Sequence, residues 1–177
     1  MAEGRRYFWP LTMIAGAAAV AVAAQVSFQL PGSAVPGTLQ GPVVLLAGGL
    51  AGALIGGSSL LLYLLLGVFG APVFAGGASG LGHLFGPTGG YLFSFPIAAA
   101  IVGRFGARGR PVRCLGAALA GMAFIQLTGA LWLKVSTHAP WSTLQNGLGP
   151  LLEQDLVKVI VVALILWPLH GALRPAA

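Results

Sequence analysis

The sequence predicts an all-α integral membrane protein with six transmembrane helices. Of its 177 residues, 57% are hydrophobic and only 7% are charged, and the mean hydropathy is +0.91. In a soluble domain about a quarter of all residues are charged, so this chain has too few charged residues to cover a water-exposed surface. Its length suits a single domain over residues 1–177 and leaves no room for a separate soluble catalytic domain.

The first transmembrane helix is expected over Phe8–Phe28, an almost wholly apolar run. This length crosses a hydrocarbon layer about 30 Å thick. Arg5 and Arg6 before an apolar run also resemble a cleavable signal peptide, but the run is long for the apolar part of one. The length therefore favours a helix that is retained.

This first helix carries alanines at a spacing of four residues, among them Ala15, Ala19 and Ala23. Small residues one turn apart form a smooth face on which another helix can approach closely. The same spacing can also arise simply from an alanine-rich composition. The stripe is thus either a face on which a partner helix can dock or a consequence of composition, and both interpretations stay open.

Two short helices are expected next, after a first loop over Leu30–Gln40. We predict one over Pro42–Ile55 and another over Ser58–Val68, divided at Gly56–Ser59. Both are shorter than the usual span of about 20 residues. Short segments interrupted by glycine often mark a substrate site in transporters.

Three further helices complete the predicted set. They are expected over Tyr91–Val102, Val112–Leu133 and Leu151–Leu169, with a polar loop over Val135–Pro150 before the last one.

The positions of the arginines predict the orientation. With six spans and both termini in the cytoplasm, seven of the nine basic residues lie on the cytoplasmic side, as the positive-inside rule favours. Topology thus explains the net charge of +6 better than nucleic-acid binding does. The three long loops, Leu30–Gln40, Ala71–Gly90 and Val135–Pro150, then lie on the outer side.

A glycine-dense stretch over Gly76–Phe95 is the most distinctive part of the sequence. It has no charged residue, so we expect it to lie against the protein. One interpretation is a plain turn between membrane helices. The other is a wall of a small-molecule pocket, where missing side chains let a ligand approach the backbone and two hydroxyls add polar contacts. The candidate residues of this wall are Gly76, Gly77, Gly86, Thr88, Gly90 and Tyr91.

Asp155 and Lys158 are the most unusual polar residues, because they fall within the predicted last helix, near its outer end. A spacing of three places them on one helix face. They can form a purely structural ion pair, with the lysine reaching toward water. Alternatively, Asp155 accepts hydrogen bonds from a ligand and Lys158 attracts an anionic group such as a carboxylate.

Two further polar residues, Thr38 and Gln40, end the first loop. They are either ligand donors or ordinary turn and capping residues. The three histidines do not form a metal motif, and Cys114 is the only cysteine. The sequence has no Gly-x-Ser-x-Gly elbow and no phosphate-binding loop, so no hydrolytic enzyme, metal site or nucleotide cofactor is predicted.

Four segments together form a recognisable pattern, namely VPGTLQGPVVLLAGGLAG (35–52), LLYLLLGVFGAPVFAGG (61–77), GPTGGYLFSFPIAA (86–99) and DLVK (155–158). In this order they resemble the BioY family, the biotin-binding S components of energy-coupling-factor (ECF) transporters. The chain departs from the family's usual pattern at Gly37, at Ser94 and at Glu153-Gln154. These departures bear on loop shape more than on the identity of the ligand.

The resemblance implies a six-helix S-component fold in the cytoplasmic membrane of a bacterium or archaeon, with biotin in an outward-facing pocket. It implies contacts from Thr88, Tyr91, Asp155 and Lys158, without saying which of them meets the ureido ring and which the carboxylate. It also implies that the alanine face docks on a transmembrane coupling protein driven by two ATPases, which alone use ATP. Function without such partners and association into homo-oligomers stay open. An S component for another vitamin and a purely structural membrane protein are the alternatives.

Overall fold

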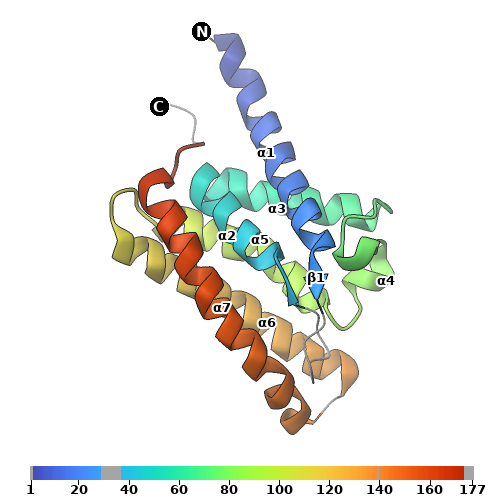
Figure 1. Cartoon of the computed structure of the whole chain (residues 1–177). Helices are drawn as coiled ribbons and strands as arrows, with labels where there is room; N and C mark the ends of the chain where they lie inside the picture. The colour runs from blue at the N-terminus through green and yellow to red at the C-terminus, as the bar shows by residue number, and fades with distance from the viewer. Residues whose placement is uncertain (1, 29–36, 139, 174–177) are drawn as a thin grey trace.

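The computed structural model describes residues 2–28, 37–138 and 140–173, and this part of the chain is almost wholly helical (Figure 1). Its longer helices, of 12 to 29 residues, are α1 (Ala2–Gln25), α2 (Gln40–Ala51), α3 (Ala53–Val68), α5 (Gly89–Phe105), α6 (Pro111–Thr137) and α7 (Trp141–Leu169). The shorter elements are the 3-10 turn η1 (Ala75–Gly77), helix α4 (Leu81–Leu84) and the strands β1 (Ser27–Phe28) and β2 (Gly37–Thr38).

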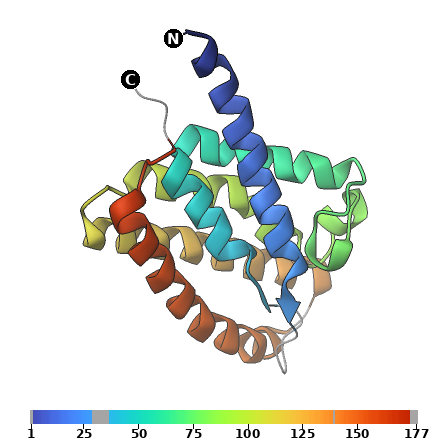
Figure 2. The ribbon, with the colours of Figure 1, turned by 45° about the horizontal axis from the view of Figure 1, so that its top comes forward.

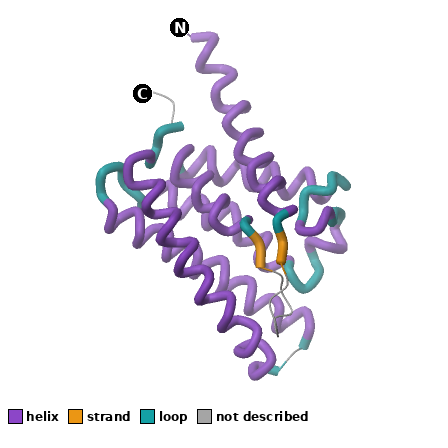
Figure 3. The backbone as a smooth tube through the Cα atoms, in the orientation of Figure 1, coloured by secondary structure: helices purple, strands orange, loops and turns teal. Residues whose placement is uncertain are grey.

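Helix α5 lies at the centre of the packing and contacts α6, α3 and α2. Its residues Ala98, Ala99 and Val102 are fully buried. The two strands pair antiparallel, with Ser27 opposite Thr38, and join the end of α1 to the start of α2 (Figure 3). The start of α1 and the end of α7 lie on the same side of the molecule, and the strand pair lies on the other (Figures 1 and 2).

Glycines bring the backbones of α2, α3 and α5 into direct contact. A Cβ atom on Gly48 of α2 would lie 2.0 Å from the carbonyl oxygen of Ala99 on α5. A Cβ on Gly56 of α3 would lie 2.5 Å from the Cα of Gly48, and one on Gly103 of α5 would lie 2.4 Å from the nitrogen of Ala53. Any side chain at these positions would force the helices apart. We call Gly48, Gly56 and Gly103 the glycine contacts.

The first part of the chain differs from the prediction at two points. Helix α1 ends at Gln25, and Ser27–Phe28 forms a strand instead of a last helical turn. The break between α2 and α3 falls at Gly52, not at Gly56–Ser59. Gly52 has φ +87°, in the region that glycine tolerates best, whereas Gly56 stays helical and uses its missing side chain for close packing.

The predicted loop over Val135–Pro150 is wrong. Helix α6 continues to Thr137, and α7 begins at Trp141, ten residues before the expected start. The stretch is polar, but a helix satisfies its own backbone groups whatever the polarity of its side chains. As a consequence, Asp155 and Lys158 lie near the middle of α7 and not near its outer end.

Two helical segments within the described residues are long and apolar enough to cross a membrane, Phe8–Gln25 and Pro111–Thr137. Helices α2, α3 and α5 are apolar but shorter. The exact count of six spans and the cytoplasmic termini therefore stay predictions.

Candidate functional site

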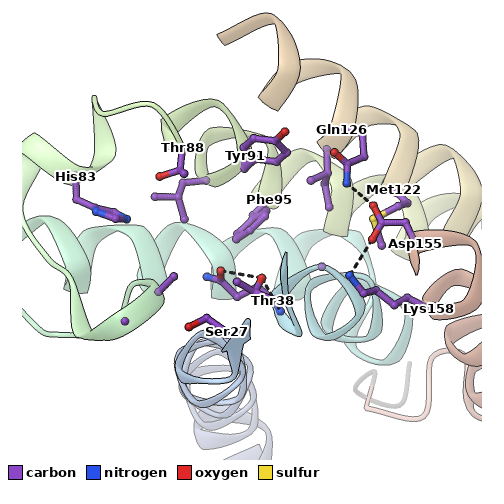
Figure 4. A pocket seen from close by; sticks show the side chains of 16 residues that line it. Ser27, Thr38, His83, Thr88, Tyr91, Phe95, Met122, Gln126, Asp155 and Lys158 are labelled. Atoms are coloured by element: carbon purple, nitrogen blue, oxygen red, sulfur yellow. Dashed lines mark hydrogen bonds and ion pairs between the residues drawn. The ribbon is translucent and has the colours of Figure 1, made fainter. Parts of the chain in front are cut away.

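A cavity of about 330 Å³ lies between the glycine-rich segment, the strand pair and helices α2, α5, α6 and α7 (Figure 4). Its two ends differ in chemistry. Asp155, Lys158 and Gln126 lie at one end, and His83 and Thr88 lie at the other. The residues that line it are Ser27, Thr38, Gln40, Gly41, Ala75, Gly76, His83, Thr88, Tyr91, Leu92, Phe95, Met122, Ile125, Gln126, Asp155 and Lys158.

The charged end is built from α6 and α7. Lys158 Nζ lies 2.9 Å from Oδ1 of Asp155, and the Asp155 side chain is only 7% exposed. The amide nitrogen of Gln126 on α6 donates to the other oxygen, Oδ2. Both oxygens of one carboxylate are therefore held, one from its own helix and one from the helix opposite (Figure 4). A largely buried ion pair needs such additional hydrogen bonds to offset its loss of hydration.

The middle of the cavity is apolar and aromatic. Tyr91, Leu92 and Phe95 project from α5, and Met122 and Ile125 from α6. The Tyr91 ring packs directly across the backbone of α6, since a Cβ on Gly129 would lie 2.3 Å from Cε1 of that ring. The Tyr91 hydroxyl is buried without a hydrogen-bond partner among the described residues. This middle section suits an apolar ligand body between two polar ends.

A chain of hydrogen bonds holds Gln40 in place. Its amide nitrogen donates to the Tyr63 hydroxyl at 2.7 Å, and that hydroxyl donates to the carbonyl of Val73 at 3.1 Å. The Thr38 hydroxyl lies 3.2 Å from Oε1 of Gln40. Both polar atoms of the buried Gln40 side chain are thus occupied. Tyr63, fully buried on α3, links the start of α2 to the segment that carries Gly76.

His83 forms part of the opposite end of the cavity. Its ring stacks on Phe74, with centroids 5.3 Å apart and an interplanar angle of 19°. Partial burial lowers the pKa of His83 below its usual value, which favours a neutral ring near pH 7. In the same part of the wall, Gly76 has φ +67°, a conformation that glycine adopts at little cost.

The remaining predicted glycines anchor or shape the wall and do not line the cavity. The indole nitrogen of Trp132 on α6 donates to the carbonyl of Gly86 at 2.9 Å. A Cβ on Gly90 would lie 2.2 Å from Cβ of the same tryptophan. Gly77, with φ +74°, is exposed beside Gly76. Gly86 therefore holds the segment between α4 and α5 against α6, and Gly90 lets the start of α5 approach α6 closely.

The structure brings together most of the residues that the sequence singled out. Thr38, Gln40, Gly76, Thr88, Tyr91, Asp155 and Lys158 line one cavity, although 120 residues separate the first from the last. The sequence analysis missed the wall from α6, namely Met122, Ile125 and Gln126. Gln126 had a detectable signal, because an amide in the middle of a long apolar helix is costly unless it has a role.

The alanine stripe of α1 is only partly available to a partner. Ala15 and Ala19 are exposed, whereas Ala23 is 7% exposed and buried within the chain. The accessible face therefore comprises the first two of the three predicted residues.

The fold matches that of a solved protein, the S-component for biotin from an ECF-type ABC transporter. The TM-score is 0.83 over 94% of this chain and 92% of the other, at 23% sequence identity. The chain therefore has the S-component fold, the fold class that the sequence predicted.

The BioY family model matches residues 8–175, and the chain belongs to this family. A probable biotin transporter BioY of Pyrococcus horikoshii is 40% identical over 87% of this chain and 91% of its own length. The biotin transporter BioY2 of Lactococcus lactis is 36% identical over 88% of this chain and 87% of its own length, and the biotin transporter BioY of Thermotoga maritima is 35% identical over 77% and 81%. The predicted family is thus confirmed, and the chain is a membrane protein.

Proposed function

We propose that this protein binds biotin and takes part in its uptake across the cytoplasmic membrane, as the S component of an ECF-type transporter. The observation that carries the proposal is the cavity itself, which has a buried Asp155–Lys158 pair at one end and an aromatic middle. Biotin has a ureido group with N–H donors and a C=O acceptor, an apolar body and a carboxylate. The names of the relatives support the same ligand.

In this proposal Asp155 accepts a hydrogen bond from the ligand and Lys158 donates one or attracts the carboxylate. Thr88 and the backbone at Gly76 contact the ligand from the glycine-rich wall. The hydroxyl of Tyr91 is buried and has no hydrogen-bond partner among the described residues. A small movement of its ring would let it donate to the ligand. Thr38 and Gln40 contribute mainly by shaping the wall, because their polar atoms already bond to each other and to Tyr63.

Titration of the purified protein with biotin, without partner proteins, tests this function. We expect saturable binding of one biotin per chain, which excess riboflavin or thiamine does not compete away. Saturable binding of labelled riboflavin or thiamine that excess biotin does not displace would point to an S component for another vitamin. A failure to bind any of the three would leave a structural membrane protein as the better description.

The membrane arrangement that we propose is six spans with both termini in the cytoplasm. Arg104, Arg108, Arg110 and Arg113 are all exposed around the turn between α5 and α6. That turn lies beside the end of α7, where the Gly109 N–H donates to the carbonyl of Trp167 at 2.8 Å. The start of α1 and the end of α7 lie on one side of the molecule (Figure 2). These features agree with one positive, cytoplasmic side.

We also propose that the exposed face at Ala15 and Ala19 docks on a transmembrane coupling protein, which two ATPases drive. Replacing both alanines by leucine should weaken co-purification with such a protein, because bulky side chains prevent close helix approach. Biotin binding by the isolated variant should not change, since neither residue lines the cavity. The matched control is Ala120→Leu, the same change at an exposed position of α6. Unchanged co-purification of the double variant would exclude this face.

A further inference from the structure

Gln126 joins the two helices that form the charged end of the cavity. It lies on α6, and its amide nitrogen donates to Oδ2 of Asp155 on α7. Lys158 Nζ holds the other oxygen, Oδ1, at 2.9 Å. Lys158 belongs to the same helix as Asp155, whereas Gln126 is 29 residues away in sequence and on the opposite wall. Gln126 is therefore the group that draws the carboxylate toward α6.

The chemistry of the two side chains fixes the orientation of the amide. An ionised carboxylate only accepts hydrogen bonds, so the NH₂ group of Gln126 must face Asp155. Its carbonyl oxygen, Oε1, then faces the opposite way, and it is buried without a hydrogen-bond partner in the described part of the chain. A buried oxygen without a partner lowers stability. The side chain is thus better suited to holding Asp155 than to stabilising the fold.

The position of the Asp155 carboxylate depends on this contact. If Lys158 alone held the Asp155 carboxylate, the two side chains would form an i,i+3 pair on one helix. The long, flexible lysine could then keep its contact while the carboxylate took several positions on the surface of α7. Held also from α6, it is restricted to one place at the end of the cavity. Each of its oxygens still has a free lone pair and can accept one N–H group from a ligand.

We propose that Gln126 is a positioning residue that sets the affinity for the ligand by fixing the carboxylate of Asp155. This inference rests on the proposed function, because the ligand used to test it is biotin. Gln126 acts through Asp155, and its effect on binding disappears when that carboxylate is absent.

The test compares Gln126→Met with the wild-type protein. Methionine has a similar length but no amide N–H. We expect the biotin Kd to rise by about tenfold to a hundredfold, as for the loss of a hydrogen bond to a charged group. The melting temperature without biotin should change little, because removal of the unpaired oxygen offsets the hydrogen bond that Oδ2 of Asp155 loses. Leu127→Met, at an exposed neighbouring position, is the control and should bind as the wild type does.

A double-mutant cycle separates positioning from a general structural role. In an Asp155→Ala background, Gln126→Met should change the biotin Kd by less than about twofold, because the group it positions is missing. Equilibrium dialysis with labelled biotin measures the Kd values, and biotin concentrations up to the millimolar range include the variants that bind weakly. An equal loss in both backgrounds, a wild-type Kd for Gln126→Met, or a lowered melting temperature without biotin would overturn the inference. A wild-type protein that does not bind biotin is a different result, and it contradicts the proposed function itself.

Discussion

Replacing Asp155 by asparagine is expected to raise the biotin Kd by a factor on the order of 10²–10³. The change preserves the shape of the side chain but leaves the charge of Lys158 uncompensated in a largely buried site. Loss of a charged, hydrogen-bonded partner at a buried binding contact costs about 2–5 kcal/mol of binding free energy, and each 1.4 kcal/mol corresponds to about a tenfold change in Kd. Isothermal titration of the purified variant with biotin measures the effect.

The control for this prediction is Arg113→Gln, which also removes one charge. Arg113 is exposed at the start of α6 and does not line the cavity, so binding should be unchanged. The double variant Asp155→Asn with Lys158→Met tests the structural alternative. If it binds biotin as tightly as the wild type but melts at a lower temperature, the pair only supports the fold.

Gly48→Ala is expected to cause the largest loss of stability among single glycine substitutions on α2. The new Cβ would lie 2.0 Å from the carbonyl oxygen of Ala99 and 2.7 Å from its Cα. These are backbone atoms of a central helix, so they cannot move aside as a flexible side chain can. Overpacking of a tight core costs about 1–3 kcal/mol and sometimes more, and we expect the upper end of this range. Thermal unfolding in detergent measures the change.

Gly116→Ala on α6 is the matched control. A Cβ placed there would meet no atom within 4 Å from any other described part of the chain, its own helix backbone aside. The variant should therefore be as stable as the wild type or gain about 0.5–1 kcal/mol from the better helix propensity of alanine. The two substitutions are chemically identical and differ only in their surroundings. Equal melting temperatures for the two variants would mean that α2 and α5 are not in backbone contact.

The sequence predicted the helical class and one side of the cavity because these depend on local patterns. A spacing of three placed Asp155 and Lys158 on one face, and the structure shows them in contact at 2.9 Å. The glycine-rich wall was recognised from its composition, and Gly76 and Thr88 do line the cavity. Neither inference required knowledge of which helices pack together.

The errors arose where one residue type can serve two purposes. Glycine can break a helix or permit close packing, and the sequence does not distinguish Gly52, which does the first, from Gly56, which does the second. Polar composition before Leu151 suggested a loop, but the helix begins at Trp141. The contribution of Gln126 depends on how α6 docks against α7, which is a long-range contact without a local pattern.

The glycine contacts have a mechanical consequence. At these three positions the backbones of α2, α3 and α5 are in direct contact. Because nothing compressible lies between them, we expect this part of the molecule to be rigid. We therefore expect the adjustments that accompany ligand binding to occur at the strand pair and the glycine-rich wall. If the molecule opens only there, the ligand enters and leaves through the same opening. Release on the other side of the membrane would then require energy from a partner, such as the proposed coupling protein.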